Sequence, residues 1–351
     1  MSTLSNVFPE DEFITLPHKS SVRIAVKWLP AKAPSPSVTL TRDDILVVCL
    51  NGLMTTMASW ADVANQVIRQ LPKNHNVSLL CYDRYGQGST TDHDPKDAQA
   101  EDPSHGHDLT DAVRDVHALV AYFSGVDSSA STAAQKPPRL ILVGNSIGCA
   151  IARLYAQTYP GRVAGLLLLD AIIANANLAT DVFPDPDDPS FDPSKEPDGV
   201  KPQDLRKMRT IMKRVFDPEV GNKEGLSRRN LRELLPYSDQ PKLVGWPATK
   251  STQSSHGPYI TVVNHGLEEF ARQAVAQNGI DATLTLVYMN PFWWKYHEGL
   301  VKITDEERAK GVIEAVGAGH FIQKERPDLV KDELIDMIEK VETLSTEWLL
   351  S

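Results

Sequence analysis

Short runs of apolar residues recur along the first half of the chain and alternate with segments in which apolar residues have helical spacing. The continuous apolar runs cover residues 45–50, 77–83, 140–144 and 163–170. Helical spacing occurs over residues 60–71, 108–123 and 146–160. Strands without polar alternation are typical of a parallel sheet covered on both faces. The pattern predicts an α/β fold, with a mostly parallel central sheet and helices on both faces. Two further β-prone runs, 13–16 and 22–28, precede it.

The alternation stops after residue 173 for about a hundred residues. Residues 181–199 hold five prolines and seven acidic residues against one lysine, so they cannot form a core element. Helix-like segments then follow at 203–216, 226–235 and 259–277. The strand pattern resumes at 283–289 and 312–321, and an amphipathic helix at 327–344 closes the chain. We therefore expect a core domain of residues 1–173 and 281–351, and a helical cap inserted at 174–280.

Charge narrows the classes of partner. The 351 residues include 36 basic and 46 acidic side chains, a net charge of −10, without a basic run. This balance argues against nucleic acid or an anionic membrane surface, and favours a neutral or apolar small molecule. The longest apolar stretch, 163–174, contains Asp170 and is too short to span a bilayer. A homodimer is left open.

The cysteines and the N-terminal residues bear on the compartment. Cys49, Cys81 and Cys149 have no metal-ligand spacing, and an odd count suits free thiols in a reducing environment. The first sixteen residues carry acidic groups where a secretory signal needs a basic start and an apolar run. We expect a cytoplasmic protein. No phosphate loop, dinucleotide fingerprint or metal-ligand pattern occurs, so no cofactor and no metal are expected.

A serine lies between two glycines in Gly144-Asn145-Ser146-Ile147-Gly148. This G-x-S-x-G pattern stands between a predicted strand and a predicted helix, the context in which it marks a nucleophile on a tight turn. The neighbouring glycines leave room for that turn. The backbone N–H of Ile147, at the helix N-terminus, points where an oxyanion would form. The alternative is an ordinary small-residue turn.

A serine hydroxyl needs a base to take its proton. His320 follows the last apolar run and precedes the final helix, and Gly-Ala-Gly before it gives the loop room to reach the serine. His256, His265 and His297 also follow the serine, but the first two fall in the expected cap and the third in a tryptophan-rich loop. We therefore assign His320 as the general base; a surface loop histidine is the alternative.

Together these motifs resemble those of the α/β-hydrolase superfamily. The residues that carry the resemblance are CLNGLMTT (49–56), YDRYGQGST (82–90), GNSIG (144–148) and GAGHF (317–321). The resemblance implies an α/β-hydrolase fold and a second oxyanion donor, which maps to the N–H of Leu53. Asn51-Gly52 stands where the family usually has His-Gly. Asp83 and Arg84 match a strand-end turn whose usual role is structural.

The orienting acid departs from the commonest pattern in this family. Many relatives place an aspartate after the next-to-last strand, but the expected strand 283–289 runs into Asn290 with no carboxylate before Glu298. A subset places the acid one strand earlier, where this chain has Asp170. Fungal zearalenone-type lactone hydrolases and some dehalogenases resemble that arrangement. Asp170 is the expected acid and Glu298 the alternative; an aspartate that only caps the turn is also open.

Cap residues in such proteins decide which substrates enter. The pocket residues expected from the sequence are Gly52, Trp246, Phe292, Trp293 and Trp294. Aromatic and methionine side chains suit a bulky, largely apolar molecule, although packing between cap and core explains any one of them equally well.

The sequence thus predicts a serine hydrolase that cleaves a carboxylic ester or lactone through an acyl-enzyme. Two other functions stay open. One is a C–C bond hydrolase or acyltransferase with the same triad, and the other is a receptor-like binding protein with little turnover.

Overall fold

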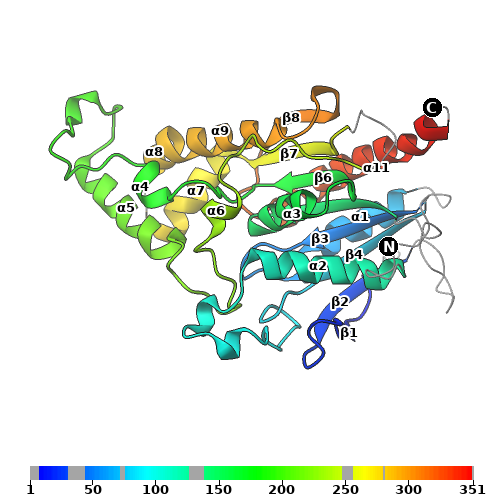
Figure 1. Ribbon diagram of the computed structural model, residues 1–351. Coiled ribbons are helices and arrows are strands. Elements are labelled where there is room, and N and C mark those ends of the chain that lie inside the picture. The colour runs from blue at the N-terminus through cyan, green and yellow to red at the C-terminus, as the bar shows by residue number, and fades with distance from the viewer. Residues whose placement is uncertain are drawn as a thin grey trace, which may run out of the picture.

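The strands form one eight-stranded sheet in the order β1-β2-β4-β3-β5-β6-β7-β8 (Figure 1). The computed structural model describes residues 8–30, 44–71, 76–125, 138–246, 256–279 and 281–349. β1 and β2 pair antiparallel, as do β2 and β4, and every pair from β4 to β8 is parallel. The strands are β1 Glu12–Ile14, β2 Ile24–Leu29, β3 Ile45–Leu50, β4 Val77–Tyr82, β5 Arg139–Asn145, β6 Val163–Leu169, β7 Tyr259–His265 and β8 Ala309–Ala315. The mostly parallel sheet is confirmed.

Helices cover both faces of this sheet, as the continuous apolar strands predict. In β3, Leu46 and Val48 face one apolar core, whereas Val47 and Cys49 face the other. Figure 1 shows α2 and α3 on the first side and α1 and α11 on the second. These helices are α1 Ala61–Gln70, α2 Leu109–Ser124, α3 Ile147–Thr158, α10 Ile322–Glu325 and α11 Pro327–Leu349.

Further helices follow β6 and β7 and gather beyond one end of the sheet (Figure 1). The first group is α4 Leu178–Asp181, α5 Pro202–Phe216 and α6 Leu231–Leu234. The second group is α7 Leu267–Asn278, α8 Ala282–Leu284, the π-helical turn η5 Thr285–Met289 and α9 Asn290–Val301. Because parallel strands end at one edge, the first group and the start of the second lie near the carboxyl ends of the strands, whereas α9 runs back along the sheet and packs against β7 and β8.

Two sequence predictions in this region are wrong. The helix expected over 259–277 is the strand β7 followed by α7, because its first residues, YITVVNH, are rich in β-branched side chains and pair between β6 and β8. The strand expected over 283–289 is helical. Asp281 caps its start by accepting from the N–H of Thr283, and Thr285 and Met289 are buried while Leu286 is exposed, which is the one-sided burial of a helix.

The expected ranges 174–280 and 281–351 each contain both strand and helix. β7 belongs to the sheet although it falls within 174–280, and α8, η5 and α9 lie outside the sheet although they fall within 281–351. Helical segments therefore follow both β6 and β7. Among the described residues, no helix has the length and apolar character that crossing a bilayer demands.

Candidate active site

Ser146 occupies a strained turn between β5 and α3. Its backbone has φ 56° and ψ −120°, in the left-handed half of the φ range that residues with side chains rarely adopt. The turn is held from both sides, because the N–H of Ser146 donates to the carbonyl oxygen of Leu169 at 3.1 Å and its own carbonyl accepts from Ile172 at 3.2 Å. The backbone of Ser146 is therefore fixed against the end of β6.

The two glycines of the motif are required by close packing. A Cβ on Gly144 would lie 2.6 Å from the backbone nitrogen of Cys149, and a Cβ on Gly148 would lie 2.2 Å from the carbonyl oxygen of Leu50. Both distances are shorter than any real Cβ contact. The turn thus brings α3 against β3 and β5 more closely than any other residue would permit.

Asp170 and His320 meet at the same edge of the sheet. Asp170 directly follows β6 and is fully buried, and His320 follows β8 with a quarter of its side chain exposed. Nδ1 of His320 lies 2.5 Å from Oδ2 of Asp170. The amide of Asn145, next to Ser146, donates to the carbonyl oxygen of His320 at 2.9 Å. The loop that carries the histidine is thereby tied to the serine turn.

Two histidines stabilise the charge of Asp170. Burial alone would raise the pKa of this carboxyl. Interaction with His265, through charge and a hydrogen bond, and a hydrogen bond from His320 outweigh burial and hold the pKa well below its usual range. Asp170 is therefore ionised at neutral pH and accepts hydrogen bonds through both oxygens.

Glu298, the alternative acid, lies on α9 and is exposed. Within the described residues, the carboxylate beside His320 is that of Asp170. The structure thus brings Ser146, His320 and Asp170 to one place and leaves Glu298 outside it.

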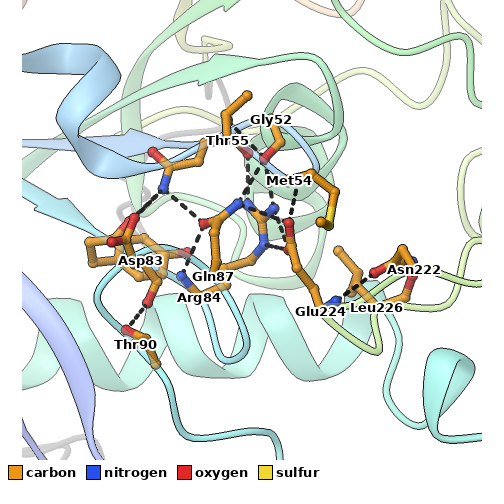
Figure 2. A network of polar contacts seen from close by, with 12 residues as sticks. Gly52, Met54, Thr55, Asp83, Arg84, Gln87, Thr90, Asn222, Glu224 and Leu226 are labelled. Atoms are coloured by element: carbon orange, nitrogen blue, oxygen red, sulfur yellow. Dashed lines mark hydrogen bonds and ion pairs between the residues drawn. The ribbon is translucent and has the colours of Figure 1, made fainter.

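The loop after β3 lies against the serine. A Cβ on Gly52 would lie 3.3 Å from Cβ of Ser146, so Gly52 and the following Leu53 border Ser146 on one side while Ile147 follows it on the other. Figure 2 shows how the loop is held from below: Arg84 donates to the carbonyl oxygens of Asn51 at 2.7 Å and of Gly52 at 2.9 Å. These contacts agree with the structural role expected for Arg84.

Glu224, from the insertion after β6, completes this network (Figure 2). Its Oε2 accepts from Arg84 at 2.8 Å, and its Oε1 accepts from Gln87 at 3.0 Å. Oε1 also accepts from the backbone N–H of Met54, a residue held at φ 57°. One fully buried carboxylate of the insertion after β6 therefore fixes both the cation and the backbone of the loop beside Ser146.

The sequence of the chain matches a known protein family. A model of the alpha/beta hydrolase family matches residues 47–333. The chain belongs to this family. No curated protein matches it.

Solved structures share the alpha/beta hydrolase fold of the chain. A putative lipase from Acinetobacter baumannii is 12% identical with a TM-score of 0.50, covering 95% of this chain and 92% of its own. A thermophilic esterase from Thermogutta terrifontis is 13% identical with a TM-score of 0.50, covering 95% and 100%. A haloalkane dehalogenase loop variant from Bradyrhizobium elkanii is 14% identical with a TM-score of 0.51, covering 96% and 99%. At these identities the likeness shows the fold.

A cavity of about 220 Å³ opens beside His320 in this alpha/beta hydrolase. Its wall is mostly apolar and sulfur-containing, with contributions from α5, α7, η5 and α9. The side chains that line it include Met208, Met212, Phe216, Phe270, Met289 and Trp293. Trp293 packs edge-on to His320, with ring centroids 6.1 Å apart, and donates from Nε1 to the carbonyl oxygen of Ala171 at 2.8 Å.

The pocket residues expected from the sequence have different outcomes. Trp293 lines the cavity, although from a helix rather than from the end of a strand. Trp246 does not, since its N–H donates to the carbonyl oxygen of Val163 at the start of β6, the opposite edge of the sheet. Phe292 and Trp294 flank Trp293 on α9 but are not among the residues that line the cavity. Gly52 borders Ser146 instead.

Three residues of the site were missed by sequence reasoning: Glu224, His265, and Asn290, whose Oδ1 lies 3.1 Å from Nε2 of His265. Glu224 and Asn290 give no motif signal, because their partners lie far away in the sequence. His265 could have been found from its β-branched context, since YITVVNH predicts a strand that ends at a histidine on the active-site edge.

Proposed function

We propose that the protein is a serine hydrolase that cleaves a carboxylic ester or lactone of a bulky, largely apolar small molecule. The observation that carries the proposal is the meeting of the Ser146 turn with the Asp170–His320 pair at one edge of the sheet. Membership of the alpha/beta hydrolase family supports the hydrolase class.

The steps follow from the positions of the groups. Asp170 accepts from Nδ1–H of His320, which leaves Nε2 as the nitrogen that takes the Ser146 proton. Oγ of Ser146 then attacks the carbonyl carbon. The N–H groups of Leu53 and Ile147 stabilise the oxyanion, and His320 returns the proton to the leaving alcohol. Water, activated by the same histidine, releases the acid and restores Ser146.

The cavity beside His320 supports an apolar substrate. Methionine and aromatic side chains dominate its wall, and Gln273 and Gln277 are among its few polar groups. Flexible thioethers adapt to irregular apolar shapes, and aromatic rings offer flat contact surfaces. An aryl ester or a macrolactone matches this lining better than a charged or strongly hydrophilic molecule.

A fluorophosphonate label and an ester screen test the proposal. The wild-type protein is expected to be labelled at Ser146, located by mass spectrometry, and to hydrolyse aryl esters or macrolactones. Ser146→Ala should lose labelling and about 10⁴-fold or more in kcat while retaining ligand binding. Ser190→Ala, at an exposed serine after β6, is the matched control and should be labelled like the wild type. Full activity in Ser146→Ala would refute the proposal.

A further inference from the structure

A second histidine contacts the carboxylate of the triad. His265 is the last residue of β7 and is fully buried. Its Nδ1 lies 2.8 Å from Oδ1 of Asp170, while His320 contacts Oδ2 of the same carboxylate. On its other side, Nε2 of His265 lies 3.1 Å from Oδ1 of Asn290 at the start of α9. Asp170 is thus shared by two histidines through different oxygens.

The hydrogen bonds of Asn290 define the protonation of His265. Nδ2 of Asn290 donates to the carbonyl oxygen of Leu267 at 3.0 Å. Reversing the amide would set two acceptors against each other, so Oδ1 must face His265. Both ring nitrogens of His265 therefore face acceptors, and the acceptor at Nδ1 is the buried carboxylate of Asp170 at 2.8 Å. A carboxylate at this distance favours the imidazolium form of the ring.

This pairing alters what His320 experiences. In a triad with a lone carboxylate, the full negative charge of the acid favours the protonated form of the base. Here the charge of His265 offsets that of Asp170 inside a buried site where screening is weak. A cation on His265 thus weakens the electrostatic support that Asp170 gives to a protonated His320.

We propose that His265 is a positioning residue that holds Asp170 for His320 and, through its positive charge, extends the pH range in which His320 acts as a base toward lower pH. The inference rests on the proposed serine hydrolase function. His265 itself is packed between Phe270, which stacks on its ring at 3.9 Å, and Trp293, whose edge meets it at 5.6 Å. Both rings keep His265 away from substrate, so its effect passes through Asp170.

Other titratable groups near the pair come from three elements: His320 after β8, Glu314 of β8, His297 of α9 and Cys149 of α3. Glu314 accepts from the N–H of Leu267 at 3.0 Å, and burial raises the pKa of Cys149 well above its usual value, so that thiol is neutral. Burial lowers the pKa of His297 to about 4. Its ring nitrogens face the neutral oxygens of Asn264 at 2.8 Å and Ala171 at 3.3 Å and contact no carboxylate, so that ring is neutral. Among the described groups, His265 is the cation that contacts the free side of Asp170.

The experiment replaces one buried histidine at a time and measures the protonation of His320. His265→Gln removes the charge and keeps an amide that donates to Asp170, whereas His297→Gln replaces a neutral ring and is the matched control. The rate of fluorophosphonate labelling of Ser146 is measured from pH 4.5 to 9, and the histidine resonances are titrated by NMR. In His265→Gln the midpoint of the acid limb, and of the His320 resonance, should rise by about one pH unit. In His297→Gln both should stay where they are in the wild type.

A second variant guards against misfolding. Asn290→Leu removes the acceptor at Nε2, so His265 no longer needs its second hydrogen, and the midpoint should again rise. The inference is overturned if folded His265→Gln has the same midpoint as the wild type. If His265→Gln does not fold, the same comparison is made with Asn290→Leu. In both cases labelling of Ser146 still reports on the serine. Absence of labelling in the wild type counts against the proposed function instead, and the NMR titration then decides the role of His265.

Discussion

Glu224 forms a buried ion pair with Arg84, with Oε2 of the carboxylate 2.8 Å from Nη2 of the guanidinium. The two residues are 140 positions apart, and their side chains are 1% and 5% exposed. Arg84 uses its remaining donors on the carbonyl oxygens of Asn51 and Gly52. The insertion after β6 is thereby linked to the loop that borders Ser146 by charge as well as by packing.

Loss of the Glu224 charge should damage stability and catalysis together. Glu224→Gln keeps an acceptor for the Met54 N–H but leaves the Arg84 cation buried without its partner, which costs about 3–5 kcal/mol of unfolding free energy. Urea unfolding measures that loss, and kcat should fall because the loop beside Ser146 is no longer held. Asp187→Asn breaks the exposed pair with Arg206 and should cost less than about 1 kcal/mol. Equal stability of the two variants would contradict this prediction.

Substitutions of Asp170 and of Glu298 should have sharply different effects on kcat. Asp170→Asn keeps the shape of the side chain but presents an amide to His320, which no longer selects the hydrogen on Nδ1. We expect kcat to fall by about 10⁴-fold at neutral pH. Glu298→Gln changes an exposed side chain of α9 and should leave kcat within about twofold. A steady-state comparison of the two purified variants measures this, and an active Asp170→Asn would contradict the assignment.

The cavity should select substrates by size. Met212 is buried and lines the wall of the 220 Å³ cavity, so Met212→Trp fills part of that space. The ratio of kcat/KM for a naphthyl or long-chain ester to that for an acetyl ester should fall about tenfold or more. Trp246→Phe, at the opposite edge of the sheet, is the control and should leave the ratio unchanged. A changed ratio in the control alone would place the pocket elsewhere.

His297 should make folding sensitive to mild acid. Burial lowers its pKa to about 4 from the usual 6.5, so between these values the unfolded chain binds a proton that the folded protein does not. Stability therefore falls as pH drops from about 6.5 to about 4, by about 3 kcal/mol in total from this one group. His297→Gln should remove that part of the slope. Urea unfolding at several pH values, compared with the wild type, checks it; parallel curves would contradict the prediction.

Local pattern was enough for much of the fold and for the residues that meet at the site. Continuous apolar runs identified β3 to β6, and the glycines around Ser146 marked the strand-to-helix turn. Asp170 and His320 were found because each directly follows a strand or its loop at the active-site edge. Residues 283–289 were predicted as a strand because an apolar run of seven residues fits a strand or a buried helix equally well. The hydrogen bond to Asp281 at the start of this segment and its packing against α7 and α9 favour the helix.

The site residues that the sequence did not predict are held by contacts with residues far away in the chain. Glu224 is one acidic residue among 46, and nothing near it in the sequence indicates a partner on the loop after β4. The pairing of His265 with Asp170 likewise needs β6 and β7 to be neighbours, and the misread strand at 259–265 concealed that. Trp246 was placed in the pocket by residue type alone, and the direction of the chain after α6 took it to the other edge.

The Glu224–Arg84 pair limits how this protein can be recombined. A chimaera that exchanges residues 171–258 for the corresponding segment of another family member discards Glu224 and leaves Arg84 with an uncompensated charge beneath the nucleophile. Such a graft is expected to alter turnover even for small esters that never touch the transplanted segment. A donor segment must therefore bring a carboxylate to the same point in space, and the insertion after β6 is not expected to behave as an independent module.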